Sequence, residues 1–339
     1  MVTNMAMLFR PRAVPKKYTK VHEKIRTRGV RLDVLCNVYR GIWTGVLHIF
    51  VVTNEIVEEY DLEWDALKPI LRGKDIGPFR YKWNERWVIY TNQDNFYERF
   101  PNVIRYLEKY KMILERRGAV WVYRRQWWEL EDPLSPEMFE IEKIMSPYIS
   151  RFNAFTYEEG KYYAMDSTSI IRFWFNENET RDYITKWREV NEQNLDANEF
   201  INLSLELLKD MGKDTNSLLY ILGILNSEVV EFYYKLYAQR VTKRGTRQPV
   251  RKYYLYVPPH LNVIPIAVGT MEERADIVRR VNAIRNIALK LDYTEGNEKE
   301  KVEEEITFMV ADLNEAVYDL YELDESERAM IQSYVLRKR

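Results

Sequence analysis

The chain is poor in the residues that build disulfides and metal sites. Its 339 residues include one cysteine, Cys36, which excludes a disulfide framework and a cysteine-rich zinc site. The three histidines, His22, His48 and His260, lie far apart and show no metal-ligand spacing. We therefore expect no metal ion in this chain, and the low cysteine content is typical of a reducing cytoplasm.

Long apolar segments are also absent. The longest apolar run, near 46–52, contains His48 and is too short to span a bilayer, so we expect no membrane contact. Residues 1–9 are too short for a signal peptide and are followed closely by Arg10 and Arg12. Both observations lead us to expect a cytoplasmic protein.

Motifs for group-transfer catalysis are lacking. No glycine-rich loop follows a predicted strand, so neither a nucleotide site nor an S-adenosylmethionine site is visible. Methyl transfer to an amino group needs a polar residue, two prolines and an aromatic ring in succession, which hydrogen-bond the target amine and stack on the flipped base. Ser146-Pro147-Tyr148 lacks one proline, and segment 257–260 has two prolines without the polar residue or the ring. We expect no catalytic residue and no cofactor here.

Two hydrolytic chemistries are disfavoured as well. A metal-dependent nuclease needs acids around a Glu-X-Lys on adjacent strands, and the acidic runs of this chain lie in polar, solvated contexts instead. A serine hydrolase of the common kind carries a Gly-X-Ser-X-Gly turn, which this sequence does not contain.

The charges are segregated although the net charge is only −1. Residues 10–31 hold nine Lys or Arg against one acid, and residues 240–252 hold six against none. Acids gather at 55–65 and at 292–305. Any binding to nucleic acid must therefore come from local basic stretches and not from the overall charge.

The hydrophobic pattern changes along the chain from strand-like to helical. Short alternating or apolar runs recur up to residue 175, with one helix expected at 101–117 after a proline. Helical spacing dominates from Thr215, with a break at Asn226-Ser227, and capping-box patterns at Thr270 and Asp324 begin further helices. The predicted strands lie on either side of a turn at 41–45, at 81–83 and 87–90 as a hairpin, and at 120–123, 143–149, 169–175 and 253–257.

Several segments, taken in order, share their spacing with one known family. The most informative are 38–45 (Val-Tyr-Arg-Gly-Ile-Trp-Thr-Gly), 67–76 (Leu-Lys-Pro-Ile-Leu-Arg-Gly-Lys-Asp-Ile), 143–150 (Lys-Ile-Met-Ser-Pro-Tyr-Ile-Ser), 219–227 ending in Ile-Leu-Asn-Ser, and 317–323 (Val-Tyr-Asp-Leu-Tyr-Glu-Leu). From about residue 31 to the end, the chain resembles the C-terminal specificity domain of TaqI-like adenine-N6 DNA methyltransferases and of related fused restriction–modification enzymes. The family's catalytic half is missing, and Val46 or Leu47 stands where the family commonly has Asn.

The resemblance implies sequence-specific recognition of double-stranded DNA. It also implies a separate catalytic partner, a methyltransferase or methyltransferase–nuclease, which would bind S-adenosylmethionine. Two alternatives remain open: the C-terminal fragment of a split methyltransferase or endonuclease, and a non-enzymatic nucleic-acid-binding scaffold in phage defence.

The combined expectation is an α+β fold with a small mixed β-sheet recognition domain and a C-terminal helical bundle. We divide the chain into a basic N-terminal arm or linker at 1–30, a β-rich target-recognition region at 31–200, and a mainly helical region at 201–339. The last region includes a basic loop at 238–252 and a strand at 253–257 that returns to the sheet. The arm is expected to follow a DNA backbone, to dock on a partner or to be disordered.

Candidate DNA contacts follow from charge and position. The basic loop is expected to meet phosphates, and Gln248 within it is a candidate for reading a base edge, although a solvated loop is the alternative. The two glycines of the 40–45 turn permit close approach to DNA. Asn226 is expected to cap a helix and not to contact DNA. The candidate DNA-binding residues are Arg40, Thr44, Arg72, Lys74, Arg151, Asn153, Arg240, Lys243, Arg244, Arg247, Gln248, Arg251 and Lys252.

Overall fold

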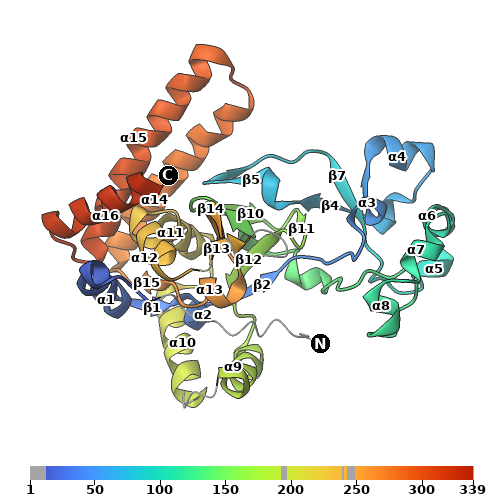
Figure 1. The fold of residues 1–339 in the computed structure, drawn as a ribbon, viewed down its shortest axis with the longest axis horizontal. Helices are drawn as coiled ribbons and strands as arrows, with labels where there is room; N and C mark the ends of the chain where they lie inside the picture. The colour runs from blue at the N-terminus through green and yellow to red at the C-terminus, as the bar shows by residue number, and fades with distance from the viewer. Residues whose placement is uncertain (1–12, 192–196, 239, 243–248, 339) are drawn as a thin grey trace.

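The computed structural model describes residues 13–191, 197–238, 240–242 and 249–338 (Figure 1). In this part of the chain, helices are combined with five small sheets, and helices predominate after residue 197. The expected α+β class with C-terminal helices is confirmed.

The elements have the following bounds. The helices are α1 (Thr19–Arg28), α2 (Leu32–Leu35), α3 (Leu47–Phe50), α4 (Asn54–Glu59), α5 (Phe96–Arg99), α6 (Pro101–Glu108), α7 (Lys111–Leu114), α8 (Gly118–Trp121), α9 (Glu177–Asn191), α10 (Ala197–Met211), α11 (Thr215–Leu225), α12 (Glu228–Tyr237), α13 (Pro258–Leu261), α14 (Met271–Ala288), α15 (Gly296–Leu320) and α16 (Glu325–Lys338). The strands are β1 (Gly29–Arg31), β2 (Cys36–Arg40), β3 (Val51–Thr53), β4 (Leu67–Leu71), β5 (Ile76–Gly77), β6 (Arg80–Tyr81), β7 (Arg86–Ile89), β8 (Glu142–Pro147), β9 (Ile149–Ser150), β10 (Thr156–Glu159), β11 (Tyr163–Ala164), β12 (Thr168–Phe173), β13 (Arg240–Thr242), β14 (Pro249–Leu255) and β15 (Pro265–Ala267).

An antiparallel sheet in the order β10-β8-β12-β2 separates two hydrophobic cores. Because side chains alternate across a strand, Ile144 and Ile171 belong to the larger core, while Met145 and Ile170 belong to the smaller one. Strands β8 and β12 are buried over nearly their whole length. The polar residues within them therefore need hydrogen-bond partners inside the protein.

The larger core is built around α11. Residues 217–225 of this helix are all buried, as expected for a helix that is apolar on every side. A Cβ atom on Gly223 would lie 2.8 Å from Cγ2 of both Ile277 and Val281, so glycine allows α14 to pack closely against α11. Helices α14 and α15 continue from this core as a projecting hairpin (Figure 1). None of the helices within the described ranges is both long and apolar enough to cross a lipid bilayer.

The smaller core belongs to a second lobe, drawn at the right of Figure 1. Its sheet has the order β11-β4-β7-β3, in which only the β11–β4 pair is parallel among the pairings described. In Figure 1 the short helices α3 to α8 lie to the right of β4 and β7, at the outer end of this lobe. The lobe contributes the turn that connects β2 to the helix α3.

The N-terminal basic segment contains an ordered helix. Tyr18, Val21 and Ile25 recur at helical spacing and are buried in the larger core. Lys24 of the same helix forms a salt bridge with Glu327 of α16, at 2.6 Å. Residues 13–28 thus dock on the helical part of the molecule.

Local signals placed the helix boundaries of the C-terminal half correctly. Asp214 caps α11 and Ser227 caps α12, so the predicted break at Asn226-Ser227 is confirmed. Thr270 and Glu273 form the predicted capping box. The same reciprocal hydrogen bonds link Asp324 and Glu327, at 2.9 and 3.0 Å.

The predicted hairpin of residues 81–83 and 87–90 is wrong. Strand β6 pairs with β5, and β7 pairs with β3 and β4. Trp83 still packs edge-on against Trp87, with ring centroids 5.2 Å apart. The aromatic residues are therefore neighbours, but their backbones hydrogen-bond to different strands.

Two further predictions need correction. Residues 120–123 were expected as a strand, but residues 118–121 form the helical turn α8, in which the Val122 amide donates to the Gly118 carbonyl at 2.8 Å. The single helix expected at 101–117 is divided into α6 and α7, with Lys109 and Tyr110 between them. In both cases a short apolar run was compatible with more than one local structure.

Strand β14 does not join the four-stranded sheet as predicted. It lies between β13 and β9 in a separate three-stranded sheet. A single backbone hydrogen bond, from the Tyr256 amide to the Tyr148 carbonyl at 2.9 Å, continues this pairing toward the end of β8.

Candidate nucleic-acid interface

The three-stranded sheet presents one buried and one exposed face. Tyr254 of β14 lies opposite Ser150 of β9 and is buried, whereas the neighbouring Tyr253 is 38% exposed. Ile149 and Arg151 share the face of Tyr253, because side chains alternate along each strand. The Arg151 guanidinium lies 5.9 Å from the centre of the Tyr253 ring. A cation and an exposed ring are thus paired on the outer face.

Arg40 stands at the end of β2 in a fixed orientation. Its Nε donates to the Asp166 carbonyl at 2.8 Å and its Nη2 to the Asp166 carboxylate at 3.0 Å. The guanidinium also lies over the rings of Tyr148, at 4.9 Å, and Trp43, at 5.6 Å. Burial raises the pKa of the Asp166 carboxyl, and the Arg40 charge opposes that rise.

The turn around Gly73 is attached to this cluster through Ser167. The Gly73 amide donates to Ser167 Oγ at 3.0 Å, and the Tyr148 amide donates to the Ser167 carbonyl at 2.8 Å. A Cβ on Gly73 would lie 2.4 Å from the Ser167 carbonyl oxygen, so only glycine fits this approach. Lys74 follows in an exposed position, while Arg72 is held by hydrogen bonds to Asp75.

These contacts bring segments that are far apart in the sequence to the same region of the molecule. Tyr148 links Arg40 and Ser167 to β14, because its carbonyl accepts from Tyr256. Beyond it, β9 leads directly to Arg151. We call the resulting region the basic–aromatic surface; it comprises Arg40, Trp43, Lys74, Tyr148, Ile149, Arg151, Phe152, Lys252 and Tyr253.

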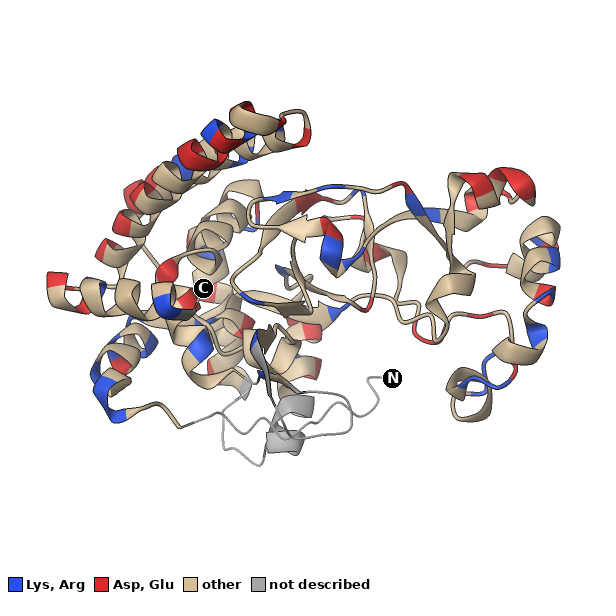
Figure 2. Cartoon of the chain, turned by 45° about the horizontal axis from the view of Figure 1, so that its top comes forward, with Lys and Arg blue, Asp and Glu red and all other residues tan. Residues whose placement is uncertain are grey.

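Acidic residues are concentrated elsewhere. They are frequent along α15 and α4, toward opposite ends of the molecule (Figure 2). The two acidic stretches at 55–65 and 292–305 therefore lie outside the basic–aromatic surface. A polyanion would meet less repulsion at this surface than at either end.

Two candidate residues are not available for contact with DNA. Thr44 is 2% exposed, and its carbonyl accepts from Nη1 of Arg117 at 2.9 Å. Asn153 is 4% exposed; its Nδ2 donates to the Leu225 carbonyl at 2.6 Å, and its Oδ1 accepts from the Tyr256 hydroxyl at 3.0 Å. We remove both from the candidate set, because both side chains are buried inside the protein.

Arg240 lies on the opposite face of the three-stranded sheet from Arg151. It pairs with Tyr254 across β13 and β14, and its guanidinium lies 5.7 Å from the Tyr254 ring. Among the described cations of the basic stretch at 240–252, Arg240 therefore faces away from Arg151. Lys252 is exposed and directly precedes Tyr253, with a φ of 69°.

Several candidates of the basic loop lie outside the described residues. These are Lys243, Arg244, Arg247 and Gln248. The backbone of Arg251 belongs to β14, but its side chain is not described. Their expected contacts with phosphates and bases stay predictions.

The sequence-based reasoning missed the exposed aromatic residues as candidates. Trp43 is 43% exposed and Phe152 is 40% exposed, although large apolar rings are more often buried. The available signal was a cation directly beside the ring, as in Arg151-Phe152 and Lys252-Tyr253.

Asn226 has the structural role expected of it. It is the C-cap residue of α11, and its side chain exchanges two hydrogen bonds with the Phe155 backbone, at 3.0 and 2.9 Å. Ser146, the polar residue of the incomplete methyltransferase-like motif, is fully buried in β8. Among the residues that the structure describes, no group of three or more His, Cys, Asp or Glu is placed to hold a metal ion.

Comparisons with known proteins place the chain near restriction–modification enzymes. No family model matches the sequence. Over 132 residues it is 25% identical to the type II methyltransferase M.BstVI of Geobacillus stearothermophilus, a match that covers 38% of this chain and 23% of the relative. Over 136 residues it is 25% identical to the type II methyltransferase M.BanIII of Aneurinibacillus aneurinilyticus, covering 37% and 23% of the two chains. The matched part thus spans about a quarter of these relatives.

The fold is similar to part of a solved structure. This is the type IIL restriction–modification enzyme MmeI in complex with DNA, with a TM-score of 0.54 and 12% sequence identity. The match covers 90% of this chain and 35% of MmeI. The chain therefore has partial homology to type II methyltransferases and a fold that is also found within a restriction–modification enzyme.

Proposed function

We propose that this chain recognises a specific double-stranded DNA sequence as the specificity module of a restriction–modification adenine-N6 DNA methyltransferase. The observation that carries the proposal is the basic–aromatic surface, in which the Arg40 guanidinium lies over the Tyr148 ring and the Arg151 guanidinium lies near the exposed Tyr253 ring. Partial homology to type II methyltransferases supports the restriction–modification context. Among such modules, the sequence motifs favour the TaqI-like kind.

Each class of side chain on this surface has its own role in the proposal. Lys74 and Lys252 are exposed cations suited to phosphates, and each such contact releases counterions. The Arg40 guanidinium is held in one orientation by Asp166, which suits bidentate hydrogen bonding to O6 and N7 of a guanine. The rings of Trp43 and Tyr253 offer apolar contact to thymine methyl groups.

The catalytic step belongs, in this proposal, to a separate domain or polypeptide. That partner is a methyltransferase or methyltransferase–nuclease that binds S-adenosylmethionine, and this chain positions it on the DNA in the cytoplasm. The coverage of 23% of the methyltransferase relatives supports a division of labour. The recognition region would be 31–200 and the helical region 201–339, with 1–30 as the N-terminal arm.

Duplex binding measured by fluorescence anisotropy across salt concentrations tests the proposal. We expect the logarithm of the affinity to fall linearly with the logarithm of the salt concentration, with a slope of several units. Repeated selection from a random duplex pool should enrich one sequence. No enrichment, or a slope near zero, would contradict the proposal.

Single substitutions show whether the basic–aromatic surface itself contacts the duplex. Arg151→Ala should weaken binding and flatten the salt slope by about one unit, because one phosphate contact or base contact is lost. Arg279→Ala is the matched control: this side chain is 72% exposed on α14, a helix that contributes no residue to the basic–aromatic surface. Its removal changes the net charge equally and should leave both quantities unchanged.

A second candidate is the C-terminal fragment of a split enzyme. The partial coverage of the relatives favours it to the same degree. Co-expression with a polypeptide that carries an Asn-Pro-Pro-Tyr motif and a glycine-rich cofactor loop distinguishes the two. A fragment yields adenine methylation only after reassembly, whereas a specificity module binds its duplex alone.

A further inference from the structure

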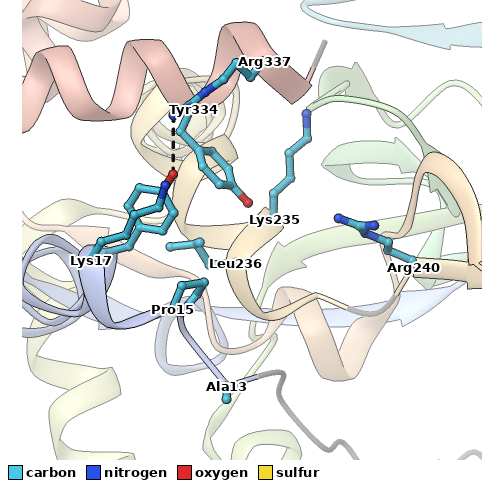
Figure 3. Close-up of a pocket in the computed structure, with 9 residues that line it drawn as sticks. Ala13, Pro15, Lys17, Lys235, Leu236, Arg240, Tyr334 and Arg337 are labelled. Carbon is cyan, nitrogen blue, oxygen red and sulfur yellow. Dashed lines mark hydrogen bonds between the residues drawn. The ribbon is translucent and has the colours of Figure 1, made fainter.

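A hollow of about 320 Å³ lies where the N-terminal segment, the end of α12 and the helix α16 meet (Figure 3). Lys17 comes from the segment before α1, Arg240 from β13 and Arg337 from α16. The two basic stretches recognised in the sequence thus share one site, together with a cation from the C-terminal helix.

The charges at this hollow are all of one sign. Among the residues that the structure describes, four Lys or Arg side chains line it and no Asp or Glu does. Lys235 is neutralised by its buried partner Glu231. Lys17, Arg240 and Arg337 form no salt bridge with any carboxylate in the described part of the chain. Three cations therefore remain to attract an anion.

Arg240 is partly buried and only partly satisfied. Its Nε atom is inaccessible and has no hydrogen-bond partner within the described part of the chain. A buried donor without an acceptor is costly, so such groups commonly mark a ligand or ordered water. Figure 3 shows the Arg240 side chain extending from β13 toward the middle of the hollow.

The other side chains at the hollow make contacts with one another. Tyr18 is buried and packs edge-on against Tyr334, with ring centroids 5.1 Å apart. Nη2 of Arg337 lies 3.5 Å from the Tyr18 hydroxyl, and its Nε donates to the Ser333 carbonyl at 2.9 Å. Helix and ring contacts thus hold this guanidinium near the hollow before any ligand arrives, which reduces the entropy lost on binding.

We propose that this hollow binds a backbone phosphate of duplex DNA. The inference rests on the proposed function and extends it: the phosphate lies on the side of the three-stranded sheet opposite Tyr253, so it belongs to DNA flanking the recognised bases. The contact carries no sequence information, because it involves only phosphate oxygens. Its effect is to add affinity and to fix the register of the duplex on the protein.

The experiment measures the salt dependence of binding to a long duplex of mixed sequence with the full chain. Arg240→Ala and Arg337→Ala should each weaken binding at low salt and reduce the log–log slope by about one unit. The sequence enriched from a duplex pool should not change. Lys20→Ala removes an exposed cation of α1 that does not line the hollow, and it should leave the slope unaltered. Circular dichroism and thermal melting establish that each variant is folded.

The outcomes separate this inference from the proposed function. If Arg151→Ala weakens binding while the Arg240 and Arg337 variants keep the wild-type slope, the hollow is not a DNA contact and the inference fails alone. If the wild-type chain binds no duplex, both fail. Titration with inorganic pyrophosphate tests the chemistry of the site directly: competition with the long duplex that Arg240→Ala abolishes supports it, and binding of pyrophosphate without competition overturns it.

Discussion

The ammonium group of Lys143 is hydrogen-bonded to the carboxylate of Glu158 across the β8–β10 pair, and neither side chain is accessible to solvent. The Glu158 carboxylate also accepts from the amides of residues 160–162, so it holds the turn after β10. Burial lowers the pKa of Lys143, and the charge of Glu158 opposes that effect. The sheet that separates the two cores thus contains a fully enclosed ion pair.

Breaking this pair should destabilise the fold strongly. Lys143→Met leaves a buried carboxylate without its counter-charge, and we expect a loss of about 3–5 kcal/mol in the free energy of unfolding. Urea denaturation of Lys143→Met, Glu158→Gln and the double variant measures it, and the double variant should lose less than the sum of the two. Lys68→Met, in a partly exposed pair with Glu140, is the control, with an expected loss below about 1 kcal/mol. Additive losses would argue against coupling.

Acidification should weaken the fold through its buried histidines. His22 stacks on Tyr233 at 4.4 Å, and burial lowers its pKa below the ordinary value; burial lowers the pKa of His260 too. Because the unfolded chain then binds protons more readily, stability is complete above about pH 6.5 and is lost as the pH falls from there through the lowered values. The urea midpoint should drop between pH 7 and pH 5.

A substitution isolates the contribution of His22. His22→Phe keeps a ring against Tyr233 and removes the titrating group, so the variant should lose less stability between pH 7 and pH 5 than the wild type. An unchanged pH dependence would mean that His260 or other groups dominate.

Gly223 allows α11 to pack closely against α14. Gly223→Ala places a methyl group 2.8 Å from Ile277 and Val281, both on α14, so the helices must separate. We expect a loss of about 1–3 kcal/mol in the free energy of unfolding. Gly77→Ala is the control, because its added Cβ would meet nothing closer than 3.8 Å. Equal effects of the two substitutions on the thermal midpoint would contradict the close approach.

Asp166 orients the Arg40 guanidinium, while the positive charge that would meet DNA belongs to Arg40. In Asp166→Asn the guanidinium keeps its charge and loses its ion pair, so duplex binding should persist with a similar salt slope. The preference for at least one base pair should relax, which selection from a duplex pool would reveal. Asp182→Asn, an exposed acid on α9, removes the same charge elsewhere and should preserve the preference. Retained selectivity in Asp166→Asn would rule out this positioning role.

The amino-acid sequence by itself determined the features that depend on neighbouring residues. The side chains of capping residues such as Asp214 and Thr270 accept hydrogen bonds from amides three positions later. The sequence therefore predicts where these helices begin. The segregation of charge was equally visible, and the acidic runs lie on α4 and α15 and in the residues beside these helices. The same local reading was ambiguous for the short apolar run at 120–123, which is helical.

Only the tertiary structure decided which distant groups meet. Arg40 and Asp166 are separated by 126 positions, and nothing in either segment specifies the other. The burial of Thr44 and Asn153, and the placement of Arg240 and Arg151 on opposite faces of one sheet, follow from strand pairing across long loops. Such pairings depend on how the whole chain packs around its two cores. The hydrophobic periodicity of one segment therefore does not predict which distant strand it pairs with.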